Sequence, residues 1–211
     1  MICLMKAWSS LQTVPFKSGG LVKGTCFPMK SVLLFAACAL TVRAQEAVPV
    51  KTMDICDLLR NPSHYNGRVI ALTGLYSPGG HGLYLRGEGC DGVLVTKGYQ
   101  WPSLVWIVSS EEEMRRRGRT IAPYMQALFQ VAATSRRELL RKGPGAKIAK
   151  VTVTYVGLFE TRDDLANTVF RRPDGTVVGA GFGQVPGAPG QLFVDSVKNV
   201  DVGVELPPDA K

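Results

Sequence analysis

The stretch DICDLLRNPSHYNGRVIALTGLY, residues Asp54–Tyr76, combines the signals of a short helix, a turn and a strand. The helix is indicated by an apolar stripe at helical spacing, formed by Ile55, Leu58 and Leu59. Either Thr52 or Asp54 can cap its start, and Asn61-Pro62 ends it. The stretch therefore predicts a helix that docks on the structure following it.

The strand of this stretch, residues 68–77, is apolar on both of its alternating faces. Tyr65-Asn66-Gly67 predicts the turn before it, because Gly67 can adopt positive φ. Gly74 lies inside the strand, where a glycine marks a sharp bend or a bulge. We therefore expect a bent first strand.

More strands are indicated on either side of a helical region. LYLRGEGC (83–90), GVLVT (92–96) and SLVWIVS (103–109) give strand signal before it. KIAKVTVTYVGLFE (147–160) and QLFVDSVKNVDV (191–202) give it afterwards. We expect a turn at RRPDGTVV and a loop at GAGFGQVPGAPG, between these last two strands.

Two helices are predicted in the region between. In SSEEEMRRRGRT (109–120), Glu111–Glu113 precede Arg115–Arg117 by four residues, which is the favourable orientation for ion pairs within a helix. A longer helix follows, capped by Thr120 and ending by Gly143. Its expected packing face consists of Ile121, Met125, Leu128, Ala132 and Leu139.

This order of elements predicts a mainly β fold with helices, of the α+β class. Specifically, we expect a five-stranded OB-like Greek-key barrel with an N-terminal helix and a helical insertion between strands 3 and 4. A first strand bent at Gly74 suits such a barrel, where one strand pairs at both ends. Residues 45–211 are expected to form this single domain.

Residues 1–44 are predicted to be an upstream extension followed by a signal peptide, with Met29 as the true start. Lys30 precedes twelve mostly apolar residues, Ser31–Val42, and Val42-Arg43-Ala44 fits a signal-peptidase site. A helix of that length spans about 18 Å, too short for a hydrocarbon core of roughly 30 Å. We expect an exported protein, periplasmic or extracellular, with no transmembrane span after signal removal; the alternative is a lipid anchor on Cys38.

Export determines how the charges and the cysteines are interpreted. The chain has a net charge of +8, but five of its 25 basic residues and none of its 17 acidic residues precede Gln45. The remainder carries 20 basic and 17 acidic residues, or +3, so nucleic acid is not the expected partner.

Cys56 and Cys90 are the two cysteines outside the leader, and in an oxidising compartment we predict a disulfide between them.

The first part of the domain resembles a known group of proteins. CDLLRNPSHYNGRVIALTG is similar to the start of small exported bacterial OB-fold proteins of uncharacterised function. GFGQVPGAPGQLFVDSVKNV resembles their last loop and strand, and the middle of the chain matches weakly. The resemblance implies a fold and a compartment, and it supplies no catalytic residues.

Candidate ligand-binding residues lie near the expected second and third strands, the face with which OB-folds bind oligosaccharides and single-stranded nucleic acids. They are His81, Tyr84, Arg86, Tyr99 and Trp101. Trp106 lies inside an apolar run, so we expect it to be buried. Neither C-x-x-C nor H-E-x-x-H occurs, and no metal or cofactor is predicted.

The sequence thus favours an exported, non-catalytic protein that binds an envelope ligand, such as a sugar polymer, or another protein. Two alternatives stay open. One is a small hydrolase that uses His64 or His81, the only histidines in the chain. The other is a protein that binds single-stranded nucleic acid through its aromatic and basic side chains.

Overall fold

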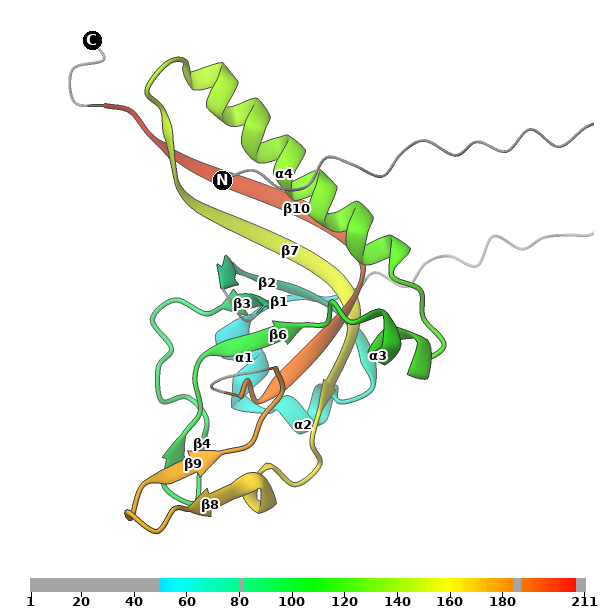
Figure 1. Ribbon diagram of the computed structural model, residues 1–211, viewed down its shortest axis with the longest axis vertical. Coiled ribbons are helices and arrows are strands. Elements are labelled where there is room, and N and C mark those ends of the chain that lie inside the picture. Colours follow the sequence, from blue (N-terminus) through cyan, green and yellow to red (C-terminus); the bar gives the residue numbers. More distant parts are fainter. Residues whose placement is uncertain (1–49, 80–81, 184–186, 208–211) are drawn as a thin grey trace, which may run out of the picture. The chain divides into compact units, whose positions relative to one another are not determined.

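One mixed sheet organises the fold, with six strands in the order β1-β2-β3-β6-β10-β7 (Figure 1). The computed structural model describes residues 50–79, 82–183 and 187–207, which belong to one compact unit, Ala47–Lys211. The predicted leader, Cys38 and His81 lie outside the described residues. The strands are β1 (Thr52–Asp54), β2 (Arg68–Gly79), β3 (Gly82–Arg86), β6 (Leu104–Ile107), β7 (Lys147–Thr161) and β10 (Gly190–Glu205).

An additional pairing of β2 with β7 closes five of these strands into a ring. The contacts between neighbours are antiparallel except between β6 and β10, where Trp106 and Ile107 pair with Gln191 and Leu192 in parallel. The three-residue β1 joins from outside the ring, parallel to β2. The molecule is therefore of the predicted α+β class, built mainly from strands.

β2 changes partner at the predicted bend. Its first part, Arg68–Leu75, pairs with β7, and its last part, Leu75–Gly79, pairs with β3. Gly74 is buried at this change, and a Cβ there would lie 3.1 Å from the Arg86 carbonyl oxygen and from the Leu85 side chain. Any larger residue at this position would require α1 or β3 to shift by a few tenths of an ångström, so the close packing here favours glycine.

β7 and β10 pair with each other along almost their whole length, from Lys147–Glu205 to Thr161–Gly190. Gly157 lies where β7 is bonded on both edges, opposite Ile70 of β2 and Val194 of β10. A Cβ on Gly157 would overlap the carbonyl group of Phe193, whose carbon would be 2.9 Å away. The closure of the ring therefore depends on this glycine.

The N-terminal helix is present as predicted. α1 (Ile55–Arg60) has Asp54 as its N-cap, with the Asp54 carboxylate accepting a 2.7 Å hydrogen bond from the Asp57 backbone N–H. A second short helix, α2 (Pro62–Tyr65), follows at once. The apolar face of α1 is fully buried, which docks it on the ring.

The predicted Glu–Arg helix is α3 (Glu111–Arg116), capped by Ser110. One of the expected pairs within the helix forms, between Glu112 and Arg116. Arg117 instead bonds Glu160 of β7 at 3.0 Å, so this helix is also tied to the sheet.

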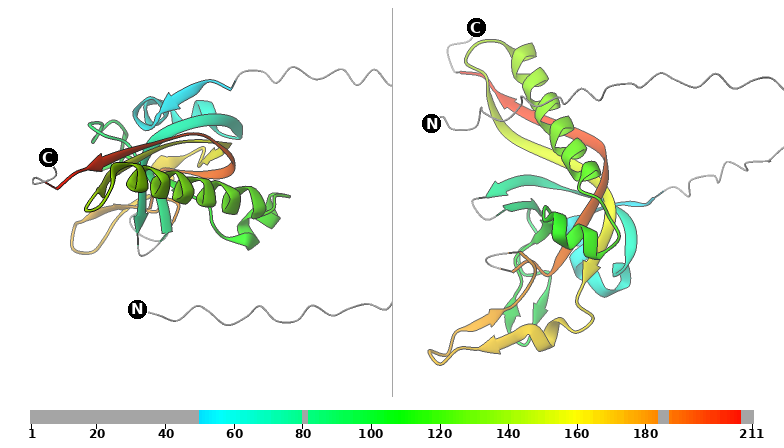
Figure 2. Two further views of the ribbon diagram at one scale, coloured as in Figure 1. Left: turned by 90° about the horizontal axis from the view of Figure 1, so that it is seen from above. Right: turned by 45° about the vertical axis from the view of Figure 1, so that its right-hand side comes forward.

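The long helix α4 (Ala122–Lys142) lies alongside β10 and β7, and Figure 2 shows this arrangement in two views. The predicted Thr120 cap was wrong, because the N-cap is Ile121 and it makes no side-chain capping bond. The predicted packing face was also wrong in part: Met125 and Ala132 are exposed. The buried residues are Tyr124, Ala127, Val131 and Ser135. The cause is that α4 has apolar residues on two faces, and periodicity does not tell which face packs.

Two small hairpins form two-stranded sheets of their own. The expected strand 92–96 is reduced to β4 (Val95–Thr96), which pairs with β5 (Tyr99–Gln100) outside the ring. Lys97 and Gly98 both have positive φ in the two-residue turn between them. The expected turn at RRPDGTVV connects β8 (Val169–Arg171) with β9 (Val177–Gly179).

The core lies inside the ring and beneath α4. Trp106 is buried, as predicted, and its ring meets Tyr84 edge-on at 4.9 Å between centroids. The largest fully buried side chains include Trp101, Tyr155, Phe159 and Phe193. Among the helices of the described residues, none has the length and apolar character needed to cross a membrane.

Cys56 and Cys90 form the predicted disulfide, with their Cα atoms 5.5 Å apart. The bond joins α1 to the loop after β3 across 34 residues of sequence. It therefore fixes the N-terminal helix against the edge of the ring.

We expect replacement of both Cys56 and Cys90 by alanine to lower the free energy of unfolding by about 3–4 kcal/mol, because the unfolded chain gains the entropy of an open loop. Urea denaturation of the variant and of the wild type measures this loss. Peptide mapping of unreduced, alkylated protein is the control and should find Cys56 and Cys90 unmodified. Alkylation of both residues without reductant would contradict the bond.

We expect Gly157→Ala to lower the free energy of unfolding by about 3 kcal/mol, because its methyl group would overlap the backbone of β10. Gly203→Ala is the matched control in the same strand pair, since the nearest atom to a Cβ there belongs to the flexible Lys150 side chain, at 3.1 Å, and the Lys150 backbone lies at ordinary contact distances of 3.6 and 3.8 Å. Its expected loss is below about 1 kcal/mol. Equal losses in urea denaturation would show that Gly157 has no special role.

Candidate functional site

The aromatic residues predicted to bind ligand are distributed over two places in the fold. Tyr84, on β3, is buried against Trp106, and Trp101 is fully buried. The Trp101 indole N–H donates a 2.6 Å hydrogen bond to Thr96 Oγ1. Tyr99 is half-buried and meets Trp101 edge-on at 5.0 Å. These rings are packed on one another rather than laid open as a stacking surface.

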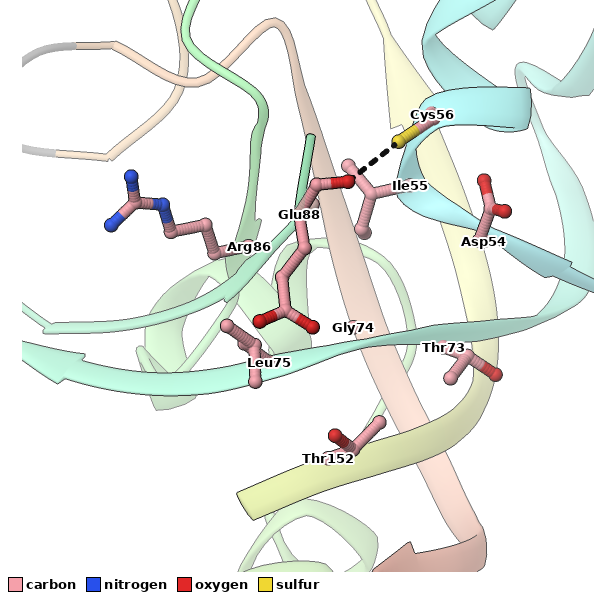
Figure 3. A pocket seen from close by; sticks show the side chains of 10 residues that line it. Asp54, Ile55, Cys56, Thr73, Gly74, Leu75, Arg86, Glu88 and Thr152 are labelled. Atoms are coloured by element: carbon pink, nitrogen blue, oxygen red, sulfur yellow. Dashed lines mark hydrogen bonds between the residues drawn. The ribbon is translucent and has the colours of Figure 1, made fainter. Parts of the chain in front are cut away.

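Arg86 is exposed and lines a pocket of about 220 Å³ beside the disulfide (Figure 3). The pocket lies where β1 and α1 meet the bend of β2 and the end of β3. Its lining combines acidic, basic and hydroxyl side chains with the glycine bend: Asp54, Ile55, Cys56, Thr73, Gly74, Leu75, Arg86, Gly87, Glu88 and Thr152. This pocket is the candidate site.

The walls of the pocket are held by close packing and by the disulfide. Gly87 is buried, and a Cβ on it would lie 2.5 Å from Cys90 Sγ and 3.2 Å from the Ile55 side chain. Cys56 Sγ lies 3.7 Å from the Glu88 carbonyl oxygen; since the sulfur is bonded to Cys90, this is a packing contact rather than a hydrogen bond. The loop that carries Glu88 is therefore fixed against α1.

The charged side chains of the pocket differ in how far other groups already engage them. Asp54 uses one carboxylate oxygen to cap α1. Glu88 faces Lys150 of β7 at 3.6 Å, and both side chains are more than half exposed, so this ion pair contributes little to stability. Figure 3 shows the Glu88 carboxylate extending over Gly74 and Leu75, whereas Arg86 points away from the two acids. Among the described residues, Arg86 makes no ion pair.

The hydroxyl groups lie on the two strands beneath these acids. Thr73 Oγ1 is 2.8 Å from Thr154 Oγ1, a hydrogen bond between β2 and β7. Thr152, two residue pairs further along, also lines the pocket. The pocket thus combines carboxylate acceptors at the start of α1 and on the loop after β3 with hydroxyl groups on β2 and β7, which suits a ligand that carries several hydroxyl or amine groups.

Of the two candidate catalytic histidines, His81 lies outside the described residues and His64 lies apart from this pocket. His64 is exposed on α2, with its ring edge-on to Tyr65 at 4.9 Å. Asp57, the acidic residue of the preceding helix α1, is paired with Arg60. In the described part of the chain, no group of three or more His, Cys, Asp or Glu side chains is arranged to hold a metal ion.

Of the residues that line this pocket, the sequence predicted a binding role for Arg86 but not for Asp54, Glu88 or Thr152. Glu88 had a local signal, because it lies between Gly87 and Gly89 and two residues before a cysteine of the disulfide. Asp54 was recognised only as a helix cap. Thr152 lies far away in sequence, so only the pairing of β2 with β7 brings it to the pocket.

A cluster of three tyrosines lies at the base of α4, formed by Tyr76 of β2, Tyr124 of α4 and Tyr155 of β7. Burial raises the pKa of Tyr155 well above its usual value, and the neighbouring phenols Tyr76 and Tyr124 raise it further. Burial also raises the pKa of Tyr76 and of Tyr124. The Tyr155 hydroxyl is buried and has no hydrogen-bond partner among the described residues, which is destabilising.

Comparisons with protein-family models, with curated proteins and with solved structures found no match for this chain.

We expect Tyr155→Phe to raise the free energy of unfolding by about 1 kcal/mol at pH 7, because it removes a buried hydroxyl that lacks a partner. Since the folded-state pKa of Tyr155 lies above the usual 10.0, the folded protein keeps a proton that the unfolded chain releases. The wild type therefore loses stability as the pH rises above about 10. The Tyr155→Phe protein should lose less stability than the wild type over the same pH range.

Urea denaturation at neutral and alkaline pH measures both effects of Tyr155→Phe. Tyr99→Phe, outside the tyrosine cluster, is the matched control. A Tyr155→Phe protein that is less stable than the wild type at pH 7 would mean that the hydroxyl makes a stabilising interaction.

Proposed function

We propose that this chain is an exported, non-catalytic binding protein with an OB-like fold. Three features support the fold. The ring connects its strands in the order β2-β3-β6-β10-β7, it contains one parallel contact, between β6 and β10, and α3 and α4 lie between its third and fourth strands in sequence. A five-stranded Greek-key barrel with a helix inserted at that point has this connectivity.

The disulfide supports the exported location. Bonds such as Cys56–Cys90 persist in oxidising compartments, and they are rare where thiols are kept reduced. The bond also holds a wall of the candidate pocket. The proposed site therefore needs the compartment that the leader predicts.

The ligand that we propose is a sugar polymer, with one sugar unit in the pocket beside the disulfide. The observation that carries this proposal is the pairing of two carboxylates, Asp54 and Glu88, with the hydroxyls of Thr73 and Thr152 around one hollow. Carboxylate oxygens accept hydrogen bonds from sugar hydroxyls, and threonine hydroxyls both donate and accept. The volume, about 220 Å³, is below the roughly 300–1,000 Å³ of typical small-molecule pockets, so it suits one unit of a longer chain.

The two alternatives from the sequence receive less support from the geometry. A hydrolase would need an oriented base; His64 is exposed and the acid on the preceding helix, Asp57, is paired with Arg60, while His81 lies outside the described residues. A single-strand binder would need open aromatic platforms, whereas Tyr84 and Trp101 are buried.

We expect Glu88→Gln to weaken binding of the sugar polymer about tenfold, because one charge-assisted hydrogen bond is lost. Isothermal titration with chitin oligosaccharides and with the glycan strands of peptidoglycan measures the affinity. Glu111→Gln, which removes one exposed negative charge on α3, is the matched control and should bind as the wild type does. Failure of the wild-type protein to bind either glycan, or equal affinities for the two variants, would refute this assignment.

A further inference from the structure

The outward face of α4 is apolar, although no described residue covers it. Met125, Phe129 and Leu140 are 39%, 69% and 73% exposed. With three smaller or charged neighbours they form a continuous surface, here called the outer stripe: Met125, Phe129, Ala132, Ala133, Arg136 and Leu140. At 100° per residue these positions lie within an arc of about 100°, turned away from the buried face of Tyr124 and Val131. The helix thus has a second apolar face in addition to the one packed on the sheet.

We propose that the outer stripe pairs, antiparallel, with the outer stripe of a second copy of this chain. The stripe is self-complementary about a point between Ala132 and Ala133. If a two-fold axis passes through that point, Met125 faces the partner's Leu140, and Phe129 faces the partner's Arg136. The two alanines face each other across the axis. This correspondence is what an isologous contact requires.

Each of these pairings is chemically favourable. Met125 and Leu140 bury apolar surface that is exposed in the single chain. A guanidinium over the face of Phe129 makes a cation–π contact, so Arg136 has a partner inside an otherwise apolar seam. Alanines at the crossing point let the two helices approach to the short end of the usual distance of about 8–10 Å.

The distribution of charge along α4 selects the antiparallel direction. Residues 122–134 contain no charged side chain, whereas the second half of the helix carries Arg136, Arg137, Arg141 and Lys142 with only Glu138 in opposition. Glu138 is already bonded to Arg141. A parallel pair would place the two basic halves against each other, and an antiparallel pair places each basic half against an uncharged half.

A helix with apolar and basic residues could also bind a negatively charged lipid surface. The distribution of the basic residues along α4 disfavours that occupant. The basic residues are confined to one half of α4, so the Met125–Phe129 end would have no electrostatic attraction to the headgroups. Arg136 lies within the stripe itself, where a membrane-bound helix places its apolar residues. In the antiparallel pair, this arginine instead meets an aromatic ring.

The surface area buried between the two helices sets the expected affinity of the dimer. A single pair of helices of this length buries less than the area of a standard protein interface, so we expect a reversible dimer with a dissociation constant of about 10–100 µM. The dimer does not involve the candidate pocket, so this inference is independent of the proposed function.

Sedimentation velocity of the full chain, from about 5 to 300 µM, tests the proposal, a range chosen to bracket the expected dissociation constant. We expect the average mass of the wild type to rise with concentration from 22.8 kDa toward twice that value. Phe129→Lys should weaken association at least tenfold, because it removes the aromatic ring and places a like charge against the partner's Arg136. Gln130→Lys is the matched control, because it adds the same charge at the next position on another face of α4, and it should associate as the wild type does. Urea denaturation verifies that both variants are folded, which is expected because both positions are exposed.

Cysteine cross-linking tests the direction of the pair, in a chain whose Cys3, Cys26 and Cys38 are replaced by serine. Chains with Met125→Cys and chains with Leu140→Cys should cross-link efficiently when mixed and poorly when alone. Efficient cross-linking of Met125→Cys with itself would indicate a parallel pair and overturn the proposal. A wild type that stays monomeric at 300 µM would also overturn it. If that monomer sediments with phosphatidylglycerol vesicles and a Phe129→Glu variant does not, the outer stripe is a lipid-binding surface instead.

Discussion

Hydrogen bonding of β7 along both of its edges is the constraint on which this fold depends. β7 pairs with β2 on one side and with β10 on the other, and this double pairing closes five strands of the six-stranded sheet into a ring. At Gly157 the backbone of β10 approaches so closely that a side chain is excluded. Sheet closure removes unpaired strand edges, which would otherwise be available for aggregation. One small residue thus permits the arrangement that protects the sheet.

The same two strands extend past the ring and determine where the long helix lies. The first residues of β7 and the last residues of β10 pair only with each other, since β2 leaves β7 at Thr152. A two-stranded ribbon is only marginally stable in water without a partner to cover its apolar face. α4 provides that cover by burying Tyr124, Ala127 and Val131 on the strand pair. The length of β7 and β10 therefore explains why a helix of 21 residues is needed.

Local signals predicted the parts of the fold that depend on neighbouring residues. The helix ending at Asn61-Pro62, the bend at Gly74 and the Cys56–Cys90 bond were all visible in the sequence, because glycine, proline and an isolated cysteine pair each have one dominant structural use. The pocket was not visible in the sequence, because strand pairing and the disulfide assemble it from four separate segments of the chain. Glu88 and Thr152, which carry the proposed function, are close only in the folded chain.

The error in predicting the buried face of α4 has a physical cause that bears on assembly. Apolar residues occur on two faces of this helix, so periodicity alone is consistent with either face packing on the sheet. The face containing Tyr124 and Val131 is the one that packs. The remaining face keeps Phe129 and Leu140 in contact with water. The free energy that burial of these two side chains would contribute is therefore not gained in the single chain. In the proposed dimer the second copy buries these side chains without any change in the ring, because α4 lies outside the ring.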